Sequence, residues 1–140
     1  MTTPPPAAVP VVVVHDSMQA QAAARFVADN NHSLIIMFAT QTALVGGPAL
    51  ALAMIPDRPP HQAIFALDCG SDPGAIFRAV EVGWTHVVAD TAIALPKNSR
   101  TSLWLRQSLI SPDRTVIDLE GSKEIAAAMT RTLLSSPRGE

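Results

Sequence analysis

The sequence predicts an α/β fold built around a parallel β-sheet. Its 140 residues are 48% hydrophobic and only 16% charged, so the chain can bury one core. Short aliphatic runs recur, continuous rather than alternating, as is typical of strands buried on both faces of a parallel sheet. Helical segments alternate with them in five βα units, which gives either a flavodoxin-like doubly wound sheet or part of a (β/α)8 barrel. A full barrel needs about 250 residues, so this chain is long enough for little more than half of one.

Five strands are predicted, each from a nearly continuous apolar run. The first is Val-Val-Val-Val, and β-branched side chains of this kind pack well on a pleated surface. The predicted strands are residues 11–14, 34–38, 63–67, 86–89 and 115–119.

Five helices are predicted between and after these strands. The third has the clearest limits: Ser71 or Asp72 can cap the first free N–H groups, Pro73 suits the first turn, and Gly83 can end the helix in the left-handed conformation. The fifth places Ile125, Met129 and Leu133 on one stripe. The predicted helices cover about residues 18–27, 48–55, 73–82, 99–109 and 125–133.

The ends of the chain differ from its middle. Residues 1–10 contain four prolines and are predicted to be a stiff, disordered leader, residues 11–134 form the single α/β domain, and residues 135–140 are a polar tail. The uncharged stretch 34–55 is long enough to cross a bilayer, but polar residues and a Gly-Gly-Pro sequence interrupt it. We therefore expect it to form a strand, a loop and a helix.

Composition excludes some partners. The net charge is −2, no basic block occurs, and aromatic residues are 4% with no tyrosine, so neither a nucleic-acid footprint nor a base-stacking surface is expected. The single cysteine, Cys69, excludes an intrachain disulfide and suits a reducing compartment. We expect a cytoplasmic protein that binds neither nucleic acid nor membranes.

Polar residues follow the predicted strands, where ligands bind in both candidate architectures. Crowded carboxylates repel one another unless a cation or raised pKa values relieve them, so a divalent metal or acid–base chemistry would fit. Each acid could instead cap a helix or make a turn, and Cys69 could be a small core residue. The candidates are His15, Asp16, Asp90 and Thr91 for ligand binding, Asp68 for catalysis, and Cys69 and Glu120 for metal binding.

Two glycines, Gly46 and Gly47, precede the second predicted helix. Backbone N–H groups at a helix N-terminus can bind phosphate, so a small phosphorylated ligand is one expectation. A plain turn explains the same two residues.

One segment resembles a known family. Residues 67–98, LDCGSDPGAIFRAVEVGWTHVVADTAIALPKN, resemble class II, metal-dependent fructose- or tagatose-bisphosphate aldolases, with Asp68, Gly83 and Asp90 at matching spacings. The stretches VVVVHDSMQAQAAARF and TVIDLEG are similar to other strands of that family. The resemblance runs from about residue 11 to residue 121 and implies a (β/α)8 relative that is truncated after about five units.

The resemblance also implies roles for two residues. In the family, the aspartate that matches Asp68 moves the proton during aldol cleavage, and the next residue is a zinc-binding histidine where this chain has Cys69. A thiolate can bind zinc, so zinc is the candidate cofactor. The family's other zinc ligands and phosphate loops come from later strands and have no counterpart here. The resemblance therefore implies a non-catalytic aldolase-like module with a binding, structural or regulatory role.

Association is expected for such a module. Half a barrel leaves an open strand edge and an apolar face, and few charges are available to cover them, so we expect a homodimer or a protein partner. Two other functions stay open: a metal-dependent aldolase completed by another chain, and a small receiver-like or nucleotide-binding domain. The last lacks paired acids after the first strand and a glycine-rich nucleotide motif.

Overall fold

The computed structural model of the chain describes residues 2–122 and 124–134, and the predicted polar tail lies outside the described residues. The strands are β1 (Val11–Val14), β2 (Leu34–Phe38), β3 (Ala63–Gly70), β4 (His86–Ala89), β5 (Ser102–Leu105) and β6 (Val116–Asp118). The helices are α1 (Ser17–Asn30), the π-helix η1 (Thr42–Gly46), α2 (Gly47–Ala53), α3 (Pro73–Val82), α4 (Arg106–Leu109) and α5 (Ile125–Leu133). The predicted α/β fold with a parallel sheet is confirmed.

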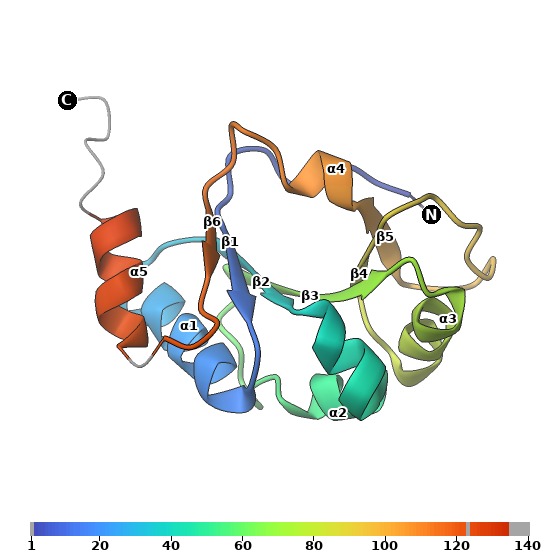
Figure 1. Cartoon of the computed structure of the whole chain (residues 1–140), viewed down its shortest axis with the longest axis horizontal. Coiled ribbons are helices and arrows are strands. Elements are labelled where there is room, and N and C mark those ends of the chain that lie inside the picture. Colours follow the sequence, from blue (N-terminus) through green and yellow to red (C-terminus); the bar gives the residue numbers. More distant parts are fainter. Residues whose placement is uncertain (1, 123, 135–140) are drawn as a thin grey trace.

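The described strands form one six-stranded parallel sheet in the order β5-β4-β3-β2-β1-β6. The chain advances by one neighbour at a time from β1 to β5 and then returns to place β6 beside β1. Right-handed crossovers therefore place α1, α2 and α3 on one face and the return segment with α4 on the other, as Figure 1 shows. The reversal of direction makes the boundary between β1 and β6 a topological switch point.

The predicted helix over residues 99–109 is wrong, because most of this segment is β5 followed by the single turn α4. Leu103 belongs to the core on the helix-covered face, whereas Trp104 belongs to the core on the α4 face. Side chains that alternate between faces in this way follow the period of a strand, and a short apolar run does not reveal that period reliably. Among the described residues the sheet consequently has six strands, not the five of the predicted βα units.

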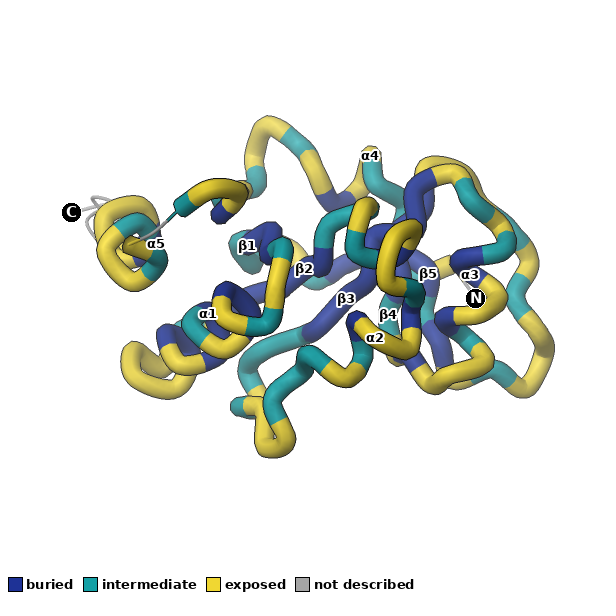
Figure 2. Tube along the Cα trace, turned by 60° about the horizontal axis from the view of Figure 1, so that its bottom comes forward, coloured by how far each residue is buried: buried dark blue, intermediate teal, exposed yellow. Residues whose placement is uncertain are grey.

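The core consists of two layers, one on each face of the sheet. In β1, Val12 and Val14 pack on the helix-covered side, while Val11 and Val13 pack on the α4 side. All four are buried, as expected for a strand covered on both faces. Figure 2 shows the same pattern for the molecule, with buried strands in the middle and exposed outer surfaces on the helices.

The proline-rich leader, predicted to be disordered, is placed by the structure against the outer edge of β5. Thr2 forms an isolated parallel bridge with Leu103, and the Thr3 N–H donates to the Leu103 carbonyl at 3.1 Å. Arg114 Nη1 donates to the carbonyls of Pro6 and Val9 at 2.8 Å each. The leader thus covers the open strand edge that half a barrel would leave exposed.

The uncharged stretch 34–55 folds as β2, η1 and α2, as expected in outline. Within the part of the chain that the structure describes, no helix combines the length and the apolar character needed to cross a membrane.

A candidate ligand site at the carboxyl edge of the sheet

The polar residues that follow the strands share one edge and one face of the sheet. On one side of β1, Val13 pairs with Asp118 of β6. On the other side, the register of β1 with β2 places His15 beside Ala39. Because Phe38 pairs with Leu67, Ala39 in turn lies beside Asp68 of β3. Because side chains alternate, His15, Asp68 and Asp118 all lie on the α4 face. Two strand spacings of about 4.8 Å separate His15 from Asp68, which divides the edge into two polar groups.

The first group joins Asp68, Asp90 and Arg106. Arg106 begins α4 directly after β5 and donates from Nη2 to Asp68 at 2.5 Å and from Nε to Asp90 at 2.7 Å. The Asp68 carboxylate is 4% exposed and also accepts from the N–H of Gly70 at 3.0 Å. Asp68 and Asp90 therefore converge as predicted, but on a guanidinium rather than around an open hollow.

Arg106 was missed by sequence reasoning because residue 106 fell inside a predicted helix. Burial lowers the pKa of Arg106, but its hydrogen bonds to Asp68 and Asp90 outweigh this and leave the pKa above its usual value. The guanidinium therefore keeps its charge and neutralises the two acids. Both carboxylates are thereby engaged in charge-assisted hydrogen bonds to the guanidinium.

Cys69 does not belong to this group, although it follows Asp68 directly. Its side chain lies on the opposite face, in the core beneath the helices, and is fully buried. Burial raises the pKa of the Cys69 thiol to about 12, and the charges of Asp68 and Asp72 add to the rise. At neutral pH the residue is a neutral thiol, and metal binding requires the thiolate.

The zinc implied by the resemblance does not fit these residues. Cys69 and Glu120 were the expected metal ligands, but β3 and β6 are three strand spacings apart, or about 14 Å. The structure therefore does not bring the two residues together.

The second group joins His15 and Asp118 across the switch point between β1 and β6. His15 Nε2 lies 2.6 Å from Asp118 Oδ1, and the two side chains are 27% and 54% exposed. The N–H of Glu120 donates to the same Asp118 oxygen at 2.9 Å. One ligand atom each from His15, Asp118 and Glu120 lies within 4.8 Å of the other two.

Gln19 positions this second group. The His15 N–H donates to Gln19 Oε1 at 2.8 Å, and Gln19 Nε2 donates to the Leu119 carbonyl at 2.6 Å. Gln19 is 5% exposed and therefore ties the end of β1 to the end of β6 from within the protein. Sequence reasoning missed this residue, although a glutamine on the buried face of the first helix was an available signal.

The two remaining candidates have different surroundings. Asp16 accepts from the Gln19 N–H at 2.8 Å and is the N-cap of α1, which is the structural alternative considered for it. Thr91 is exposed in the loop after β4.

A hollow of about 310 Å³ opens beside the second group. It lies between the end of β1 and the η1–α2 segment, and most of its wall is apolar. A π-helix is rare and occurs frequently at functional sites. The lining residues are His15, Gln41, Thr42, Val45, Gly46, Leu50 and Met54.

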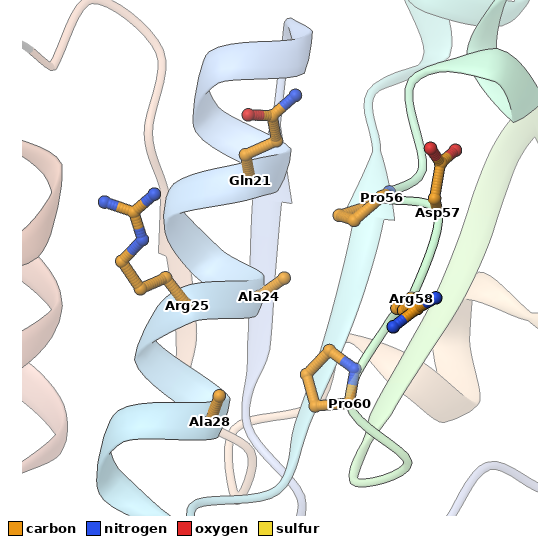
Figure 3. A pocket seen from close by; sticks show the side chains of 8 residues that line it. All are labelled: Gln21, Ala24, Arg25, Ala28, Pro56, Asp57, Arg58 and Pro60. Atoms are coloured by element: carbon orange, nitrogen blue, oxygen red, sulfur yellow. The ribbon is translucent and has the colours of Figure 1, made fainter.

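Another hollow, of about 380 Å³, lies between α1 and the loop that precedes β3. Figure 3 shows Ala24 and Ala28 facing this loop, while the Arg25 guanidinium points away from it. Gln21, Asp57 and Arg58 also line this hollow, but it lies away from the carboxyl ends of the strands, where α/β sheets bind ligands, so it is the weaker candidate.

Comparisons of the chain with models of known protein families, with curated proteins and with solved structures find no match. Function must therefore be inferred from the chemistry of these side chains.

Proposed function

We propose that this chain is a non-catalytic binding module that holds a small molecule in the hollow beside His15. The observation that carries the proposal is the His15–Asp118 pair at the β1–β6 switch point, next to a hollow of about 310 Å³. Open α/β sheets bind ligands in the crevice outside the carboxyl ends of their strands, and this hollow lies at the carboxyl end of β1. An apolar wall with a few convergent polar groups is typical of small-molecule sites.

The lining favours a small, largely apolar ligand with one polar end. Leu50, Met54 and Val45 supply apolar surface, while His15, Gln41 and Thr42 supply hydrogen bonds. When the His15 ring is neutral and Nε2 donates to Asp118, Nδ1 is left as an acceptor. A small phosphorylated ligand stays a prediction, although none of the residues that line this hollow is a lysine or arginine.

Aldol cleavage is not part of the proposal. The expected proton-moving residue, Asp68, is held by Arg106, and the expected zinc ligand, Cys69, is a buried neutral thiol on the other face. We expect no cleavage of a ketose bisphosphate by the purified chain with zinc. Turnover that requires Asp68 would contradict this and would mean that the purified chain is itself a working aldolase.

The binding proposal is tested with a library of small fragments, screened by ligand-observed NMR. Leu50→Trp should fill the hollow and weaken the binding of the fragments that bind the wild type, roughly tenfold or more. Leu134→Trp is the matched control, because Leu134 is similarly accessible but does not line the hollow. Equal binding to both variants, or no fragment that binds, would contradict the proposal.

A homodimer or protein partner also stays a proposal. The leader covers the β5 edge and α4 covers one face, which removes part of the reason for association. Exposed apolar side chains supply another reason: Val45 and Leu50, which line the hollow, are 86% and 49% exposed, and Met18 and Leu44 are 75% and 54% exposed. Light scattering at micromolar concentration should give a mass above that of one chain, and a monomer would contradict this.

A further inference from the structure

We propose that His15, Asp118 and Glu120 bind a divalent transition-metal ion at the β1–β6 switch point. This site shares His15 with the ligand hollow but does not depend on the proposed binding of a small molecule. The three side chains come from segments about a hundred residues apart in sequence, and the parallel pairing of β1 with β6 brings them together.

The distances suit a metal after small side-chain rotations. One ligand atom from each residue already lies within 4.8 Å of the others, and zinc binds such atoms at about 2.0–2.2 Å. His15 Nε2 and Asp118 Oδ1 are 2.6 Å apart and would separate slightly as the cation replaces their hydrogen bond. Asp118 and Glu120 are exposed, so their carboxylates can rotate without disturbing the core.

The backbone beneath the site is held in place. Gln19 bonds to the N–H of His15 and to the carbonyl of Leu119, the residue between the two acids. This glutamine is buried, so the ends of β1 and β6 are fixed relative to each other before any ion arrives.

Charge distinguishes this group from the other acids on the same edge. Asp68 and Asp90 already share the cation of Arg106. The imidazole of His15 carries at most one positive charge against the two carboxylates of Asp118 and Glu120. A divalent cation would balance this group.

The ligand types indicate which metals fit. Magnesium and calcium prefer sites made of oxygen ligands, whereas imidazole suits zinc, iron, nickel and copper. One nitrogen and two carboxylates leave at least one coordination position open, as in catalytic zinc sites. Because His15 also lines the hollow, that open position would lie next to the space proposed for the small molecule.

The experiment is calorimetric titration of the full, untagged chain with Zn²⁺ and, separately, Mg²⁺. We expect one Zn²⁺ per chain, with binding weakened roughly tenfold or more in Asp118→Asn and in Glu120→Gln. Glu81→Gln, an exposed acid on α3, is the matched control and should bind like the wild type. Thermal unfolding without metal should be similar in all four proteins.

The imidazole resonances of His15 should also shift with Zn²⁺ in a heteronuclear NMR spectrum. Zinc that binds instead at His32, His61 or His86, or that binds Asp118→Asn and the wild type equally, would overturn the proposal. A failure to bind zinc at 100 μM Zn²⁺ would overturn it as well, because a dissociation constant of roughly 100 μM is the weakest expected of a specific site. Leu50→Trp should keep full zinc affinity, so failure of the hollow and failure of the metal site are distinguishable.

Discussion

At the scale of single residues, neighbours in the sequence can have opposite surroundings. Asp68 and Cys69 are consecutive in β3, yet Asp68 faces Arg106 at the α4 side while Cys69 lies beneath the helices. The alternation of side chains along a strand causes this difference. The pair could be predicted to lie near the strand end, but their separation could not, because β3 extends beyond the predicted residue 67 to Gly70.

The buried thiol of Cys69 gives the first prediction at this scale. In the unfolded chain it ionises near 9.0, whereas in the folded protein burial raises its pKa to about 12. Between these values unfolding releases a proton, so the free energy of unfolding falls as pH rises, by at most about 1.4 kcal/mol per pH unit. Below pH 9 this contribution to stability is complete.

Urea unfolding at pH 8 and pH 10.5 measures this effect, with Cys69→Ala as the comparison. The chain has no tyrosine to titrate in the same range. The wild type should lose more stability than Cys69→Ala between the two pH values. An equal loss in both proteins would show that the thiol is accessible in the folded state.

At the scale of elements, helix caps explain some acids that looked like candidate ligands. Asp16 caps α1 through the Gln19 N–H, and Asp72 caps α3 through the N–H groups of Gly74 and Ala75. The limits of α3 could be predicted from such signals, and its predicted range of 73–82 is confirmed. Asp16 was ambiguous because the same residue stands both at a strand end and at a helix start.

Substitution of Asp16 separates these two roles. Asp16→Ala should lower the free energy of unfolding by about 1 kcal/mol, and Asp16→Asn by only a few tenths, because asparagine also caps helices. Neither variant should change fragment binding at the hollow. Asp29→Ala, in the last turn of the same helix, is the control and should be neutral or slightly stabilising, since an acid there opposes the helix dipole.

Stability is measured by urea unfolding with the fluorescence of Trp84 and Trp104, both of which are buried. A loss of fragment binding in Asp16→Asn at unchanged stability would mean that Asp16 contacts the ligand.

The limits of sequence-based prediction are clearest for β5 and α4. Apolar continuity was enough to locate the other strands, including the 115–119 run that becomes β6. It was not enough for Ser102–Leu105, because an apolar run this short does not distinguish a strand from a helix. Because of this error, Arg106 was not recognised as a site residue, although its guanidinium holds the Asp68 carboxylate.

At the scale of the whole molecule, the order of the strands selects the site. The residues His15, Asp118 and Glu120 could be predicted to lie at the carboxyl edge, but their proximity depends on β6 pairing with β1. The number and sequence of the elements do not determine that pairing, because the return from β5 could have ended at either edge of the sheet. The candidate site is therefore a property of topology rather than of a local motif.

The docking of the leader is also a property of the whole molecule, and one substitution tests it. Ala8 has a left-handed backbone with φ of 63°, which disfavours a residue with a Cβ. If the leader is docked as described, Ala8→Gly should raise the free energy of unfolding by up to about 1 kcal/mol. Ala7→Gly is the control, since Ala7 is also exposed but is not among the residues with positive φ.

Ala7→Gly should be neutral or slightly destabilising in the same urea unfolding experiment. Identical behaviour of the two variants would show that the leader does not hold this conformation in solution.

The central claim is that the molecule binds its ligand in the hollow between the end of β1 and the η1–α2 segment, and not at the acids of β3 and β4. The most direct measurement is a map of amide chemical-shift changes on titration with the fragment that binds most tightly. The changes should concentrate at His15 and along residues 41–50, which surround the hollow. Changes centred on residues 68–70 and 90–91, or on the hollow between α1 and the loop before β3, would contradict the claim.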